Sequence, residues 1–170
     1  MRLSDREICR TFPSSISLSE SSILSGWVRR PFVTGVSRYA DRKENLPALG
    51  PRIYLEVKPG WFKGTVFAMV DTAAPWCIFE PTVGDFIRES FDQVSETVRL
   101  STRLGTFLGN LYRGPLFVPA LEGEPLDVEA TVFVSSDWPP GRNFLGYEGL
   151  LQRIRFAVDP EANLFYFGRV

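Results

Sequence analysis

The stretch VFAMVDTAAP at residues 66–75 decides the fold of this 170-residue chain. Its apolar first half predicts a strand over residues 65–70, and the alternating stretch 53–57 predicts a partner strand joined to it by a Pro-Gly turn. The predicted hairpin runs straight into Asp71, and the small residues that follow let the backbone turn tightly beneath the carboxylate. Taken alone, a carboxylate at a strand end forms a turn or cap more often than a catalytic site.

The rest of the chain predicts further strands and at most two short helices. Segment 104–109, which contains two glycines, is expected to be the tip of a mobile hairpin. Thr82 is the expected N-cap of the first helix. No internal repeat is visible, so the pattern favours one all-β domain. We expect strands at 98–103, 111–118, 126–134, 154–158 and 164–167, and helices at 82–91 and 146–152.

The composition favours a single core whose chemistry depends on carboxylates. With 44% hydrophobic and 14% aromatic residues, the chain is able to bury one good core. Its 19 basic and 20 acidic residues are interspersed, so no nucleic-acid partner is expected. The chain contains no histidine, which excludes Ser/His and Cys/His nucleophile pairs and the common zinc sites.

The sequence divides into an N-terminal extension and one folded domain. Residues 1–45 are rich in Ser and Arg and show no sustained period, so we expect a partly disordered or peripheral extension, with the domain at 46–170. No apolar run approaches the roughly 20 residues that cross a bilayer, and the start lacks the core of a signal peptide. We therefore expect a soluble, cytoplasmic protein without a membrane partner, in which Cys77 packs as a small hydrophobe and a bridge to Cys9 is disfavoured.

A second motif, Asn143-Phe144-Leu145-Gly146, changes the interpretation of Asp71. It lies 74 residues further on (145 − 71 = 74, counting to Leu145). In chain order, the sequence has an acid, a hydroxyl residue and small residues at a strand end, then a glycine-tipped hairpin, and then two apolar residues, a glycine and a short helix. In this order they resemble the retropepsin-like aspartic proteases, especially their non-viral bacterial members. The resemblance covers roughly residues 46–170 and is carried by VFAMVDTAAPWCIFEP and NFLGYEGLLQRIRFAVDPEANLFYFG.

The resemblance implies a closed retropepsin-like β-barrel that works as a two-fold homodimer, with a flap from each subunit over an extended peptide. By position, Asp71 is the catalytic residue, Thr72 bonds across the dimer axis, and Ala74 lines the cleft. The catalytic loop and its support comprise Thr72, Ala73, Ala74, Leu145 and Gly146. The flap, which is expected to bind substrate, corresponds to Gly105, Thr106, Phe107, Leu108 and Gly109.

The physical chemistry of paired carboxylates agrees with this assignment. Two carboxylates about 3 Å apart cannot both ionise, so the pair shares one proton and provides both a base and an acid for attack by water. No other aspartate in the chain is followed by a hydroxyl residue and two small residues, so a catalytic pair requires a symmetric dimer. We expect an aspartic endopeptidase whose partners are a second copy and a peptide or protein substrate, and which needs no metal or organic cofactor.

Two departures from the family pattern leave alternatives open. Ala73 stands where the family usually has glycine, and the added methyl group is costly only if the native φ is positive. Pro75 and Tyr147 replace an acid and an arginine that pair in retroviral members, and joint loss of both charges is tolerated. The alternatives are an inactive dimer of this fold that binds extended peptides, and a monomeric structural domain in which Asp71 caps local backbone groups.

Overall fold

The computed structural model describes residues 32–41 and 52–170 and is built almost entirely of β-strands. Within these residues, no helix is long and apolar enough to span a membrane. The elements are, in chain order, β1 (Gly35–Arg38), β2 (Ala40–Asp41), β3 (Ile53–Pro59), β4 (Val66–Asp71), β5 (Cys77–Ile78), α1 (Pro81–Ser90), β6 (Asp92–Gln93), β7 (Val98–Thr102), β8 (Gly105–Val118), β9 (Glu122–Gly123), β10 (Leu126–Val134), β11 (Phe144–Gly146), the 3-10 turn η3 (Leu151–Arg153), β12 (Ile154–Asp159) and β13 (Leu164–Arg169).

Six strands close into a barrel. Strands β3, β4, β11, β5, β10 and β8 are neighbours in that order, and β8 pairs back to β3 through Lys58 opposite Phe117. Closure leaves neither edge of this sheet unpaired, which is how small β-proteins avoid exposed strand edges. The predicted all-β closed barrel with one or two short helices is therefore confirmed.

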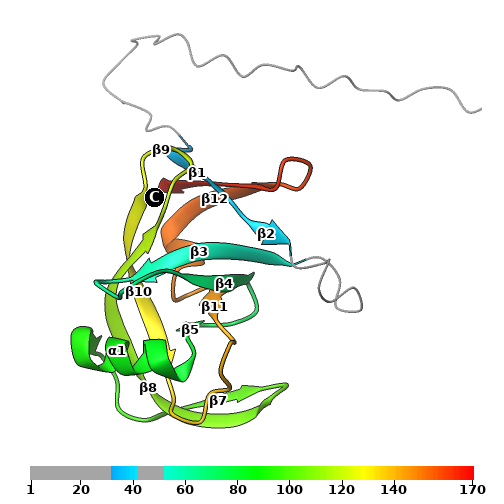
Figure 1. Cartoon of the computed structure of the whole chain (residues 1–170). Coiled ribbons are helices and arrows are strands. Elements are labelled where there is room, and N and C mark those ends of the chain that lie inside the picture. The colour runs from blue at the N-terminus through cyan, green and yellow to red at the C-terminus, as the bar shows by residue number, and fades with distance from the viewer. Residues whose placement is uncertain (1–31, 42–51) are drawn as a thin grey trace, which may run out of the picture. The chain divides into compact units, whose positions relative to one another are not determined.

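The barrel core consists of the inward side chains of alternating strand positions. Leu55, Val57 and Leu116 are buried, as expected for strands with one face toward the core. Figure 1 shows β8 and β10 as long curved strands that run from the end carrying β1, β12 and β13 to the end carrying the β7–β8 hairpin. The two ends of the barrel therefore have different neighbours, with β1, β12 and β13 at one end and the β7–β8 hairpin at the other.

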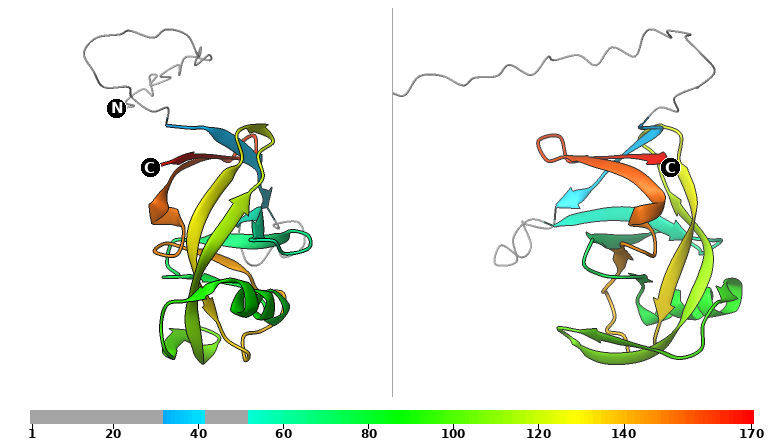
Figure 2. Two further views of the ribbon diagram at one scale, coloured as in Figure 1. Left: turned by 90° about the vertical axis from the view of Figure 1, so that its left-hand side faces the viewer. Right: turned by 180° about the vertical axis from the view of Figure 1, so that it is seen from behind.

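A four-stranded sheet of order β12-β13-β1-β9 forms the end opposite the hairpin, as the two views in Figure 2 also show. Its central pairing joins Val36 to Tyr166 and Arg38 to Leu164. Strands β1 and β2 lie within the stretch assigned from sequence to the N-terminal extension, so this part of it contributes to both sheets. The remainder of the predicted extension, and Cys9, lie outside the described residues.

Helix α1 begins earlier than predicted. Its N-cap is Glu80 rather than Thr82, with Pro81 in the first turn and no side-chain capping bond. Proline suits the first helical position because its missing N–H would have no helical partner there. The predicted helix at 146–152 is reduced to η3, because Gly146 belongs to β11, residues 147–150 form turns, and only Leu151–Arg153 is helical.

The β7–β8 hairpin turns at a different place from the predicted tip. Thr102 pairs with Gly105, so the turn consists of Arg103 and Leu104, and residues 105–109 belong to β8. Gly105 supplies a φ of +132° after the turn. Gly109 instead permits close approach, since a Cβ there would collide with the backbone oxygen of Val134. The two glycines therefore have different functions, and only the first belongs to a turn.

Candidate active site

The position of Asp71 is set by the parallel pairing of β4 with β11. Asp71 is the last residue of β4, and its Cα lies opposite Gly146, with Leu145 opposite Val70. The pairing joins residues 75 positions apart in sequence (146 − 71 = 75). The two motifs singled out in the sequence therefore meet in space, in the relation that the resemblance implied.

The carboxylate of Asp71 is oriented by its own loop. The N–H of Ala73 donates a hydrogen bond to Oδ1 at 2.9 Å, and the N–H of Ala74 donates to the Asp71 carbonyl oxygen at 3.2 Å. Within residues 32–41 and 52–170, no hydrogen bond reaches Oδ2 of Asp71. One carboxylate oxygen is thus held in place, while the other remains available to an external partner.

Leu145 and Gly146, which the resemblance assigns to the support of this loop, lie on β11 beside the end of β4. Leu145 is fully buried, and a Cβ at Gly146 would collide with the backbone of Trp76. The N–H of Tyr147 donates to the Ala74 carbonyl at 2.7 Å. The Pro75 carbonyl accepts from the Gly149 N–H at 2.9 Å, so backbone hydrogen bonds hold the two segments together where the resembling family has a charge pair.

The backbone of Ala73 has an ordinary conformation without a positive φ. Among the described residues, Asn163 is the only non-glycine residue with a positive φ. Ala73 therefore carries none of the strain that the methyl group would cause at a glycine-only conformation. Its side chain is exposed, as is that of Thr72, which makes no side-chain hydrogen bond within the described residues.

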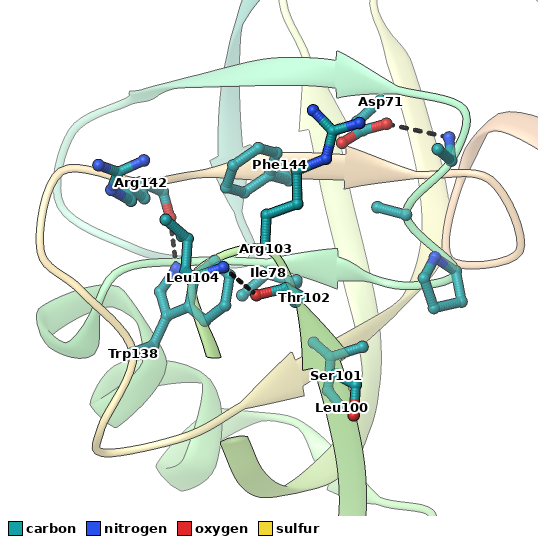
Figure 3. Close-up of a pocket in the computed structure, with 13 residues that line it drawn as sticks. Asp71, Ile78, Leu100, Ser101, Thr102, Arg103, Leu104, Trp138, Arg142 and Phe144 are labelled. Atoms are coloured by element: carbon teal, nitrogen blue, oxygen red, sulfur yellow. Dashed lines mark hydrogen bonds between the residues drawn. The ribbon is translucent and has the colours of Figure 1, made fainter. Parts of the chain in front are cut away.

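A cavity of about 500 Å³ lies between the Asp71 loop and the β7–β8 hairpin. Figure 3 shows the side chains that line it, from the Asp71 loop, from β7 and its turn, and from the loop that leads to β11. Apolar side chains form most of the wall, and Asp71 is the only carboxylate among the described residues that line it. The lining residues are Asp71, Ala73, Ala74, Pro75, Ile78, Leu100, Ser101, Thr102, Arg103, Leu104, Trp138, Arg142 and Phe144.

The predicted flap residues do not line this cavity. Gly105, Thr106, Phe107, Leu108 and Gly109 are all absent from its wall, which is formed by β7 and the turn instead. Phe107 is buried and contacts Trp138 edge to face, with ring centroids 4.8 Å apart. Thr106 and Leu108 point to solvent on the other face of the strand.

The lining residues that the sequence analysis did not assign to the site include Arg103, Leu104, Trp138 and Arg142. A two-residue turn placed directly before Gly105, instead of a tip across 104–109, would have included the first two. Trp138 and Arg142 meet through a hydrogen bond from indole Nε1 to the Arg142 carbonyl oxygen at 2.7 Å. The Trp-Pro-Pro-Gly segment at 138–141 is typical of a loop, but nothing in the sequence indicates that this loop reaches the Asp71 cavity.

Cys77 lies on β5, two residues after Pro75, and is fully buried. Burial raises the pKa of the Cys77 thiol to about 12, because the thiolate would lose its hydration in the core. This agrees with its predicted packing as a small hydrophobe, and the thiol is unsuited to nucleophilic chemistry. Within the described residues, no cluster of three or more acidic, Cys or His side chains is placed to hold a metal ion.

No family model and no curated protein matches the sequence. Among solved structures, the chain is similar to a retropepsin-like aspartic protease from Rickettsia conorii. The two share 15% sequence identity with a TM-score of 0.41, over 78% of this chain and 98% of that chain. A likeness this distant assigns neither an activity nor residue roles, so the proposal below depends on the chain's own residues.

Proposed function

We propose that this chain is a retropepsin-like aspartic endopeptidase that hydrolyses peptide bonds as a homodimer. One observation carries the proposal. Asp71 lies at the end of β4, in register with Gly146, and within the described part of the chain it is the only carboxylate in a cavity whose wall is mostly apolar. A single acid in such a place is poised for proton transfer but lacks its partner.

The proposed reaction needs a second carboxylate, and a second copy of Asp71 supplies it. With one proton shared by the pair, the ionised carboxylate takes a proton from a bound water, which attacks the scissile carbonyl carbon. The protonated carboxyl donates to the carbonyl oxygen, forming a tetrahedral diol. Its collapse breaks the C–N bond as a proton passes to the leaving amine. Neither a metal ion nor an organic cofactor is required by these steps.

The local structure around Asp71 supports the dimer. The Ala73 N–H occupies Oδ1 and leaves Oδ2 open to a partner carboxyl group. Thr72 is exposed and its hydroxyl has no partner in the described part of the chain, so it is able to bond across a two-fold axis. An isologous contact at this loop would place each residue twice about one axis, as a shared catalytic pair requires.

The cavity supports an extended peptide as substrate. Its floor presents Asp71, and the β7 hairpin presents Ser101 and Thr102 beside apolar side chains such as Leu100 and Phe144. Because β7 pairs only with β8 among the described strands, its other edge is available for backbone hydrogen bonds. A peptide in strand conformation would use this edge while its side chains enter the apolar wall.

The test compares the full chain with Asp71→Asn on a diverse mixture of unstructured peptides, from about pH 4 to about pH 7, where a carboxylate pair should share a proton. Products are identified by mass spectrometry, and light scattering establishes whether each protein is dimeric. Asp92→Asn, at an exposed carboxylate on β6, is the matched control. We expect defined cuts by the parent and the control, and a loss of about 10²- to 10⁴-fold in Asp71→Asn.

Two results would contradict the proposal. A protein that stays monomeric at every concentration would remove the catalytic pair and favour a structural domain in which Asp71 only caps its loop. Dimers that bind the peptides but cut none, with binding unchanged in Asp71→Asn, would favour the inactive peptide-binding dimer.

A further inference from the structure

Two arginines line the cavity that contains Asp71, and neither has an acidic partner among the described residues. Arg103 belongs to the turn of the β7–β8 hairpin, and Arg142 to the loop that precedes β11. The ion pairs within residues 32–41 and 52–170 involve Arg88, Arg113 and Arg153 instead. The cavity therefore presents two guanidinium groups to one carboxylate, and Figure 3 shows both among the side chains of its wall.

The backbone of Arg142 is held from both sides. Its carbonyl oxygen accepts the Trp138 indole N–H at 2.7 Å, and the preceding Gly141 N–H donates to Glu80 Oε2 at 2.8 Å. The following Asn143 side chain accepts from the Glu80 N–H at 2.8 Å. The exposed guanidinium thus extends from a fixed point, which lowers the ordering cost of binding an anion there.

Arg103 extends from a turn that is also internally bonded. The Leu104 N–H donates to Thr102 Oγ1 at 3.0 Å, and the same hydroxyl donates to the Gly105 carbonyl at 3.2 Å. The two arginines come from elements on different sides of the cavity. A ligand between the hairpin and the Arg142 loop would therefore be within the region that both side chains border.

The remaining lining favours apolar groups. Pro75, Ile78, Leu100 and Phe144 contribute apolar surface to the same cavity wall as the two arginines. A guanidinium fork matches the two oxygens of a carboxylate, and it repels a cationic side chain. The complementary ligand is a peptide segment with apolar side chains and one carboxylate.

We propose that Arg103 and Arg142 are specificity-determining residues that select an Asp or Glu side chain close to the cleaved bond, flanked by apolar residues. The part of this inference that concerns the cleaved bond rests on the proposed function. The charge preference itself is a property of binding, so it is measurable whether or not the bond is cut.

The first experiment profiles cleavage of the peptide mixture and then measures kcat/KM for the best-cleaved peptide containing Glu and for its Gln counterpart. In Arg142→Met we expect kcat/KM for the Glu peptide to fall about tenfold, while the Gln peptide changes less than about twofold. Arg142→Lys should restore part of the difference, and Arg103→Met should act in the same direction. Arg99→Met is the matched control, because Arg99 lies on β7 but outside the cavity wall.

The second experiment measures binding of the same two peptides, fluorescently labelled, to the full chain carrying Asp71→Asn. We expect the Glu peptide to bind about tenfold more tightly than the Gln peptide at low salt, with a smaller ratio at high salt. Cleavage without any acidic preference, or a preference that survives the Arg103→Met/Arg142→Met double variant, would overturn the inference while leaving the protease intact. If no peptide is cut, the binding data decide. Equal binding of the two peptides would overturn the inference, whereas a preference for the Glu peptide that disappears in the double variant would support it.

Discussion

The two walls of the cavity are held in place by different forces. The Asp71 loop is fixed by backbone hydrogen bonds, through the register of β4 with β11 and the bond from the Tyr147 N–H to the Ala74 carbonyl at 2.7 Å. The hairpin wall rests on side-chain packing, because among the described strands β7 pairs only with β8. Leu100 and Phe107 anchor it to a cluster that contains Phe133 and Trp138.

The Asp71 loop is therefore held in a fixed position, whereas the β7–β8 hairpin is able to change its position at lower cost. Backbone bonds and a buried glycine fix the carboxylate to the direction that proton transfer requires. A hairpin packed on a few aromatic side chains opens at lower cost, since local stability follows the number of buried contacts that must be broken. The proposed endopeptidase activity would need both properties, because the acid must be ordered before the substrate arrives and the hairpin must admit a peptide chain.

The largest effect should come from truncating the aromatic anchor of the hairpin. Phe107→Ala should lower the free energy of unfolding by about 3 kcal/mol, because it leaves a void beside Trp138. Hydrogen exchange should accelerate at the amides of β7 but not at those of β4 and β11. Leu108→Ala, at the neighbouring side chain that is 60% exposed, is the control and should change little. Equal acceleration in β4 would show that the two walls form one cooperative unit.

An intermediate effect is expected from crowding the Asp71 loop. Gly146→Ala places a methyl group against the Trp76 backbone, so we expect a loss of about 2 kcal/mol in unfolding free energy and increased exchange at residues 70–77. Denaturant titration provides the energy. Gly84→Ala, in α1, is the control, where the contact with Val134 Cγ1 at 3.1 Å is offset by better helix propensity. An unchanged stability in Gly146→Ala would mean that the loop is as adjustable as the hairpin.

The smallest effect should come from restoring the glycine usual in the resembling family. Because Ala73 does not adopt a positive φ, Ala73→Gly should lower stability by up to about 1 kcal/mol through the greater entropy of the unfolded chain. Peptide cleavage should change less than about threefold, as measured by kcat/KM. A large gain in activity would show that the methyl group obstructs the reaction despite its ordinary backbone conformation.

The Asp71 wall was more predictable from sequence than the hairpin wall. An apolar strand that ends in acid, hydroxyl and small residues is a local pattern, and so is the Leu145-Gly146 support. The predicted position of the hairpin tip was wrong because both glycines, at 105 and 109, were assigned to the turn. Gly109 is required by close approach of β8 to Val134, a contact between residues 25 positions apart (134 − 109 = 25) that leaves no local signal.

The amino-acid sequence by itself determined the all-β class, the strand ending at Asp71 and the burial of Cys77, because alternation and apolar runs are properties of neighbouring residues. Only the tertiary structure decided that β8 closes the barrel onto β3, and that Arg103, Trp138 and Arg142 border the Asp71 cavity. It also decided that Ala73 is unstrained. These features arise where distant segments meet, and their positions follow from strand register and packing rather than from the residues beside them in the chain.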